Sequence, residues 1–178
     1  MRSLLLSIAL AMIATAAASA QATPYSKAPP AAGAAPGSDS AHIPDFMIAL
    51  ADGKHLTRAD LDKSKPVMIV YYSPTCDHCQ HFGQDLAAHI GEFKGVQIVM
   101  VTFRPLNEVQ DFIRITHLTG SGALIGSEGL RWTVQHHYNI TTFPFVAAYD
   151  RHWKLRGVFR YPPVDLSTLR RDLLGHEK

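Results

Sequence analysis

The feature that most constrains the fold is an apolar run, VMIVYY at residues 67–72, which is followed almost at once by TCDHC. A run that is apolar at nearly every position is typical of a strand buried on both faces of a sheet. A Ser-Pro pair ends the run, and Phe82, Leu86 and Ile90 then recur at helical spacing. The only two cysteines of the chain are therefore expected in the first turn of a helix that follows a buried strand.

The other elements follow from periodicity and turn residues. Strands are expected at residues 46–50, 96–102, 143–150 and 154–161. Helices are expected at residues 56–61 (capped by Thr57), from the first cysteine to Gly91, at 107–117, at 127–137 (capped by Ser127), and after the cap Asp165. Residues 119–127 are expected to form a glycine-rich loop.

This order of elements predicts an α/β domain. The strand, helix, strand succession favours parallel pairing with a right-handed crossover, and the last two strands are close enough to form an antiparallel hairpin. We therefore expect a central mixed sheet with helices on both faces, ending in the hairpin and one more helix.

The N-terminal residues indicate export. Residues 1–20 combine Arg2, an apolar stretch and a small-x-small site, as in a signal peptide cleaved after Ala20. A membrane anchor is disfavoured because the apolar run is shorter than the roughly 20 residues that a bilayer requires. Residues 21–42 are rich in Pro, Ala, Gly and Ser and are expected to be a flexible linker, so the folded domain is expected at residues 43–178.

Composition narrows the classes of function. A chain of 178 residues with 47% apolar content suits one domain. Its 17 Lys and Arg residues nearly balance 15 Asp and Glu residues, with no run of like charge, so a nucleic-acid surface is not expected. After signal cleavage no stable membrane insertion is expected, and the predicted location is the periplasm.

Export bears on the expected chemistry of the two cysteines, because disulfides persist outside the cytosol. On the first turn of a helix, Cys76 and Cys79 come within disulfide reach of each other. The first sulfur also faces free backbone N–H groups and the positive end of the helix dipole, which favour its thiolate. Cys76 is thus expected to be the nucleophile and Cys79 the resolving thiol.

Three stretches resemble the thioredoxin superfamily, and more closely its exported TlpA/ResA-like thiol-disulfide oxidoreductases. They are IPDFMIALADGKHLTRADL, KPVMIVYYSPTCDHCQ and YNITTFPFVAAYDRHWKLRGVFRY, within about residues 43–174. The resemblance implies a thioredoxin-like fold and a redox-active disulfide between Cys76 and Cys79. It also implies that Pro144 is a cis-proline beside the cysteines, with Phe143 and Thr142 before it binding an incoming peptide strand.

The chain departs from this pattern where an acid is usual. The positions that hold carboxylates in thioredoxin and in ResA-like proteins are Val70 and Phe82 here, so no carboxylate proton carrier is visible. Asp77 and His78 are candidates for that role. They are also expected to tune the couple, since an imidazolium at His78 steadies a thiolate whereas a carboxylate at Asp77 opposes it. The direction of electron flow stays open at this point.

Two other functions compete. Cys76, His78, Cys79 and His81 are a possible copper or zinc set, although tetrahedral zinc sites usually need a second ligand pair at matched spacing. A thiol peroxidase shares the fold, but its PxxxTxxC pattern would need proline at Ile69. A purely structural bridge would close too short a loop to stabilise much.

The sequence therefore predicts an exported thiol-disulfide oxidoreductase, a reductant of the TlpA type. Its expected partners are protein disulfides and dithiols, with a membrane protein as a candidate electron donor. No cofactor and no metal are expected. The reduction potential and the partner proteins do not follow from the residues.

Overall fold

The computed structural model describes residues 41–160 and 164–175. The predicted signal peptide (residues 1–20) and nearly all of the predicted linker (residues 21–42) lie outside these residues, so both stay predictions. Within the part of the chain that is described, no helix is long and apolar enough to cross a membrane.

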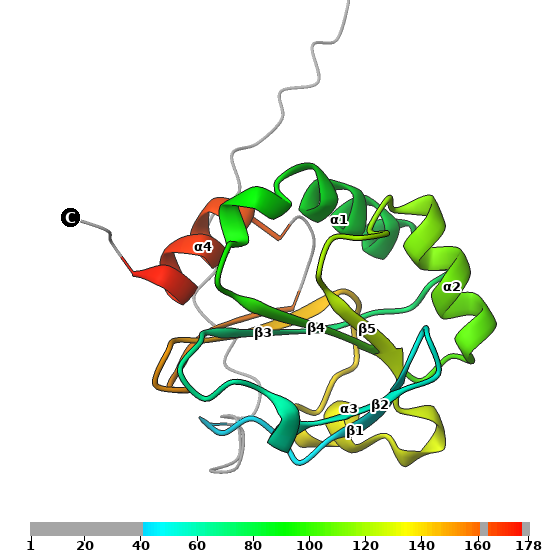
Figure 1. Cartoon of the computed structure of the whole chain (residues 1–178), viewed down its shortest axis with the longest axis horizontal. Helices are drawn as coiled ribbons and strands as arrows, with labels where there is room; N and C mark the ends of the chain where they lie inside the picture. The colour runs from blue at the N-terminus through cyan, green and yellow to red at the C-terminus, as the bar shows by residue number, and fades with distance from the viewer. Residues whose placement is uncertain (1–40, 161–163, 176–178) are drawn as a thin grey trace, which may run out of the picture.

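A seven-stranded mixed sheet forms the centre of the molecule, in the order β2-β1-β5-β4-β3-β6-β7 (Figure 1). Its strands are β1 (Met47–Leu50), β2 (His55–Thr57), β3 (Val67–Tyr71), β4 (Gln97–Thr102), β5 (Leu124–Ser127), β6 (Phe145–Tyr149) and β7 (Leu155–Phe159). Strands β3, β4 and β5 pair in parallel, and the neighbours on either side pair antiparallel. The C-terminal ends of the three parallel strands therefore share one edge of the sheet.

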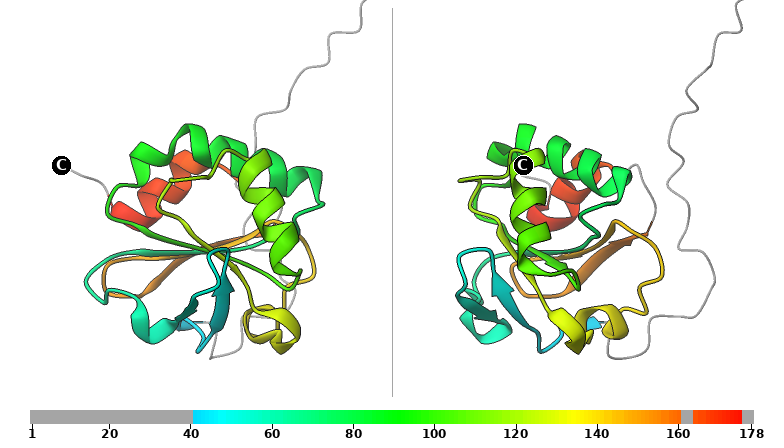
Figure 2. Two further views of the ribbon diagram at one scale, coloured as in Figure 1. Left: turned by 45° about the vertical axis from the view of Figure 1, so that its right-hand side comes forward. Right: turned by 90° about the vertical axis from the view of Figure 1, so that its right-hand side faces the viewer.

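Helices cover both faces of the sheet. They are α1 (Asp77–Ala88), α2 (Leu106–Ile115), α3 (Thr133–His137) and α4 (Leu166–Leu174), with short 3-10 turns η2 (Arg58–Asp60), η3 (Ile90–Phe93) and η4 (Gly129–Arg131). Helices α1, α2 and α4 lie on one face, and α3 lies on the other (Figures 1 and 2). The predicted α/β fold class, with its mixed sheet, C-terminal hairpin and last helix, is confirmed.

Strand β3 divides the core into two clusters. All five of its residues are buried, as the apolar run predicted. Met68 and Val70 face the cluster under α1, α2 and α4, whereas Val67, Ile69 and Tyr71 face the cluster on the side of α3. This alternation follows from the two-residue period of a strand.

The prediction that residues 119–127 are entirely loop is wrong. Residues 124–127 form β5, which pairs with β4 on one side and β1 on the other. Gly126 allows the close pairing with β1, since a Cβ there would lie 2.4 Å from the carbonyl oxygen of Ala49. A glycine that permits close approach of two backbones reads in sequence like a loop residue.

The prediction of a helix at residues 56–61 is also largely wrong. Leu56 and Thr57 belong to β2, because they pair with β1 across the Asp52-Gly53 turn. Only the single 3-10 turn η2 follows. Thr57 begins that turn, and its side chain and Asp60 form the capping box.

Two predicted helix boundaries are corrected. Helix α1 ends at Ala88 rather than at Gly91, and the separate turn η3 follows. The helix predicted at residues 127–137 is split by Trp132, whose φ of 54° is left-handed. Ser127 ends β5 instead of capping this helix.

Candidate redox site

Cys76 lies between the end of β3 and the start of α1. It is the N-cap residue of that helix, and its carbonyl oxygen accepts the amide hydrogens of Cys79 and Gln80, both at 3.0 Å. Its side chain is partly exposed. An accessible sulfur at a helix N-terminus is the placement expected of an attacking thiol.

Cys79 lies in the first turn of α1 but points into the core. Its relative exposure is 0%, and it packs with the apolar residues between α1 and the sheet. Burial raises the pKa of its thiol, the neighbouring Cys76 thiol adds to this, and the Ser73 backbone N–H opposes it. Both cysteines are free thiols in the structure, so the disulfide between them stays a prediction for the oxidised protein.

A segment far away in sequence meets Cys76. The Phe143-Pro144 peptide bond is cis, as the resemblance implied. The Cys76 thiol faces the carbonyl oxygen of Phe143 at a distance of 4.0 Å between Sγ and O. The side chain of Thr142 is used inside the fold, where its hydroxyl donates to the carbonyl of Arg160 at 2.7 Å.

Aromatic rings extend from Phe143 across this edge of the sheet. The Phe143 ring lies 5.9 Å from Tyr71 and 6.5 Å from Phe103, measured between ring centroids. Phe103 in turn stacks on Trp132 at 5.4 Å. Neither Phe103 nor Trp132 is among the site residues predicted from the sequence. The position of Phe103 immediately after a buried parallel strand is the signal that could have identified it.

A buried carboxylate that sequence reasoning missed supports this aromatic row. Glu128 is 3% exposed, and it accepts hydrogen bonds from the Tyr71 hydroxyl at 2.7 Å and from the Val134 backbone N–H at 2.8 Å. It thereby links β3 to the first turn of α3. No sequence signal marks Glu128, because the sequence predicts a loop at residues 119–127, where β5 precedes it.

The predicted tuning residues lie on the surface. Asp77 and His78 are both exposed in the first turn of α1. Neither side chain makes a hydrogen bond or ion pair with any described residue. Val70 and Phe82 are both buried and apolar, so the usual carboxylate positions place no acid beside Cys79.

The histidines do not gather around the cysteines. In residues 41–160 and 164–175, no group of three or more His, Cys, Asp or Glu side chains is arranged to hold a metal ion. His78 and His81 are both exposed on α1. The metal-binding alternative therefore has no ligand cluster in its favour among these residues.

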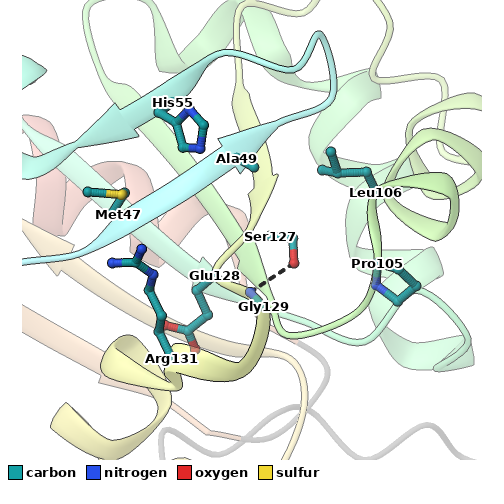
Figure 3. A pocket seen from close by; sticks show the side chains of 9 residues that line it. All are labelled: Met47, Ala49, His55, Pro105, Leu106, Ser127, Glu128, Gly129 and Arg131. Carbon is teal, nitrogen blue, oxygen red and sulfur yellow. Dashed lines mark hydrogen bonds between the residues drawn. The ribbon is translucent and has the colours of Figure 1, made fainter.

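A shallow cavity of about 260 Å³ opens between the β1–β2 hairpin and the segments that follow β4 and β5 (Figure 3). It is lined by Met47, Ala49, His55, Pro105, Leu106, Ser127, Glu128, Gly129 and Arg131. The Ser127 hydroxyl accepts the Gly129 amide hydrogen at 3.0 Å at its base. Because neither cysteine lines it, this cavity is separate from the thiol pair.

Solved structures share the fold. A secreted disulfide oxidoreductase of Mycobacterium tuberculosis, described as homologous to E. coli DsbE, is 16% identical with a TM-score of 0.63, over 74% of this chain and 96% of that one. DsbF of the same organism, solved in mixed oxidised and reduced forms, is 18% identical with a TM-score of 0.60, over 75% and 94%. A thiol:disulfide interchange protein of the thioredoxin family from Chlorobium tepidum TLS is 20% identical with a TM-score of 0.61, over 81% and 100%.

Sequence comparison gives the family. Among curated proteins, none matches the chain closely enough to count as a relative. The family model of the AhpC/TSA family matches residues 40–150, which include β1 to β6 and both cysteines. The chain therefore belongs to the AhpC/TSA family and is a thioredoxin-like oxidoreductase.

Proposed function

We propose that the protein exchanges thiols and disulfides with protein substrates through the Cys76/Cys79 couple. The observation that carries this proposal is the unequal burial of two thiols on one helical turn. Cys76 is accessible at the helix start, whereas Cys79 is fully buried behind it. Exchange requires this division, because one sulfur must meet the partner and the other must be kept from it until the mixed disulfide forms.

In the reducing direction, the Cys76 thiolate attacks one sulfur of a partner disulfide. The partner S–S bond breaks, its second sulfur leaves as a thiolate, and Cys76 is joined to the partner by a mixed disulfide. Cys79 then attacks the Cys76 sulfur, the bond to the partner breaks, and Cys79 yields its proton to the departing partner thiolate. Two electrons have passed to the partner, and Cys76 and Cys79 are joined by a disulfide.

The backbone before Pro144 is the proposed docking edge. The Phe143 carbonyl lies 4.0 Å from the Cys76 sulfur, so an extended peptide pairing with the Thr142-Phe143 backbone would bring its own disulfide to the nucleophile. The rings of Phe143, Phe103 and Trp132 would supply apolar contact alongside. This geometry favours polypeptide substrates over small ones.

The reductant role, the periplasmic location and a membrane electron donor belong to the same proposal. They rest on the signal-like residues 1–20 and on the TlpA/ResA-like motifs. The structurally similar M. tuberculosis enzyme is described as secreted, which is consistent with export. His78 and Asp77, exposed beside Cys76, are the proposed tuning residues.

Peroxide reduction is the second candidate. Thiol peroxidases share the fold, and the match of residues 40–150 to the AhpC/TSA family is compatible with this activity. The site itself supports it less. The position of the peroxidase proline is Ile69, which is buried in the middle of β3 and pairs with strands on both sides. A proline there would remove a ladder hydrogen bond, so the peroxidase pattern does not suit this strand.

Trapping the mixed disulfide tests the assignment. Reduced protein is mixed with an oxidised peptide, quenched with acid and analysed by mass spectrometry. Cys79→Ser should accumulate a mixed disulfide at Cys76, and Cys76→Ser should form none. Trapping by Cys76→Ser alone would reverse the two roles, and rapid hydrogen peroxide turnover without peptide exchange would favour the peroxidase.

The reduction potential of the couple tests the direction of electron flow. A value near that of thioredoxin, about −270 mV, is expected for a reductant. A value above about −150 mV would instead identify an oxidant. Equilibration with glutathione buffers provides the measurement, and His78→Ala should lower the value by removing a group that steadies the thiolate.

A further inference from the structure

The hydroxyl of Tyr72 is the one buried side-chain oxygen or nitrogen, among the described residues, that has no hydrogen-bond partner in the protein. A buried hydroxyl without a partner is costly, so native proteins seldom keep one without a use. A phenylalanine would fill the same space without this cost. The hydroxyl therefore calls for an explanation in chemistry rather than in packing.

The position of Tyr72 relates it to the resolving thiol. Tyr72 follows directly on β3, and its ring packs against Phe112 of α2 with a centroid distance of 4.3 Å. It is fully buried in the same core cluster as Cys79, on the α1 side of the sheet. Tyr71 points the other way, toward Glu128.

The two groups also interact electrostatically. Burial raises the pKa of Tyr72, and a negative charge on Cys79 raises it further. The phenol therefore keeps its proton and remains a donor when the Cys79 sulfur becomes charged.

The resolving step needs such a donor. Cys79 must carry negative charge while it attacks the Cys76 sulfur, in a setting whose burial opposes that charge. The Ser73 backbone N–H opposes this rise in the pKa of Cys79. The positions where related proteins carry an acid are the apolar Val70 and Phe82.

We propose that the Tyr72 hydroxyl donates a hydrogen bond to the Cys79 sulfur as that sulfur becomes a thiolate in the mixed disulfide. Tyr72 keeps its proton throughout, and the proton of Cys79 goes to the departing partner thiolate, so the phenol stabilises charge and carries nothing. A hydrogen bond to an ionised acceptor is about twice as strong as one between neutral groups. This inference rests on the proposed function, because it concerns the second step of that exchange.

Single-turnover kinetics separate the two steps. Reduced protein is mixed with an oxidised peptide, and the mixed disulfide is followed by acid quench and mass spectrometry as it forms and then resolves. In Tyr72→Phe, formation should proceed at the unaltered rate, while resolution should slow about tenfold, equivalent to about 1.4 kcal/mol in the barrier. The matched control is Tyr138→Phe, which removes a phenol hydroxyl bonded to that of Tyr149 at 2.6 Å in the other core cluster, and it should change neither rate.

Stability supplies a second readout. Tyr72→Phe removes an unpaired buried hydroxyl, so the urea midpoint of the reduced protein should stay the same or rise. Tyr138→Phe breaks a buried hydrogen bond, so its midpoint should fall. A slow resolving step in a protein that is no less stable cannot be attributed to damage of the core.

Either of two results would overturn the inference. One is equal resolution rates in Tyr72→Phe and the unaltered protein. The other is a Tyr72→Phe protein in which both steps slow and the midpoint falls, which would give the hydroxyl a structural role. An unaltered protein that shows no mixed disulfide and also leaves the peptide oxidised would instead refute the proposed function, and the inference with it.

Discussion

Two thiols three positions apart differ in solvent exposure because the first lies at the N-terminal end of the helix and the second faces the core. Cys76 is the N-cap residue and stays partly exposed, while Cys79 turns toward the sheet and is fully buried. Residues separated by one turn lie on the same face of a helix, one behind the other, so the packing of α1 on the sheet buries the second thiol and leaves the first partly exposed. The burial of Cys79 gives a pH dependence that can be measured.

Burial raises the pKa of Cys79 above its usual value of 9.0, so the folded protein holds this proton to higher pH than the unfolded chain does. The stability due to the buried thiol is thus fully present below pH 9 and declines as the pH rises beyond it. The free energy of unfolding of the reduced protein should fall by about 1.4 kcal/mol from this group between pH 8 and pH 10.

Urea unfolding at a series of pH values measures this effect. Cys79→Ala is the control, because it keeps the tyrosines, which ionise at higher pH, and removes only this thiol. The difference in free energy of unfolding between the two proteins should shrink by that amount across the window. A difference that does not change with pH would contradict the burial of an intact thiol.

At the scale of elements, the short strand β5 holds the sheet together. It joins the β1–β2 hairpin to the parallel strands, and Glu128, which follows it, is bonded to β3 and α3. The pairing of β5 with β1 depends on the missing side chain at Gly126. A side chain there has no room, because the nearest atoms belong to backbone.

Gly126→Ala should therefore lower the free energy of unfolding by about 1–3 kcal/mol or more, since its Cβ would lie 2.4 Å from the Ala49 carbonyl oxygen. Gly91→Ala is the matched control, because a Cβ at Gly91 meets nothing within 4 Å, and it should be nearly neutral. Urea denaturation of both variants provides the comparison. Equal stabilities would mean that β1 and β5 are not paired this closely.

For the whole molecule, helices on the two faces of the central sheet make three layers, and Cys79 is buried in the core between the sheet and helices α1, α2 and α4. Helix α4 packs against β6 and β7 on the same face as α1, and Leu169 shares a core cluster with Cys79. Helices α4 and α1 thus pack on one core. Loss of packing under either helix should therefore also destabilise the other.

Leu169→Ala should lower the free energy of unfolding by about 2–5 kcal/mol, because a fully buried leucine leaves a cavity when truncated. Unfolding should remain a single transition when it is followed both by far-UV circular dichroism and by the accessibility of Cys79 to alkylation. Leu130→Ala, at a side chain that is 90% exposed, should change stability by less than about 0.5 kcal/mol. Two separate transitions would show that α4 is not part of the same core.

Sequence alone was enough wherever the signal was local. The apolar run of β3, the helical stripe of α1 and the Asp165 cap of α4 are each visible in a few neighbouring residues of the sequence, and all three elements are present. The placement of both cysteines at the start of α1 followed from that same local order. A buried strand followed by a helix has few other ways to arrange itself.

Tertiary structure decided what depends on partners far along the chain. Strand β5 exists because β4 and β1 pair with it, although its own glycine resembles a loop. The Phe143 carbonyl reaches Cys76 only because β6 pairs with β3. The unpaired Tyr72 hydroxyl, in the same core cluster as the buried thiol, likewise appears only once α1 and α2 close over the sheet, because burial and the lack of a partner are properties of the packed core rather than of any one segment.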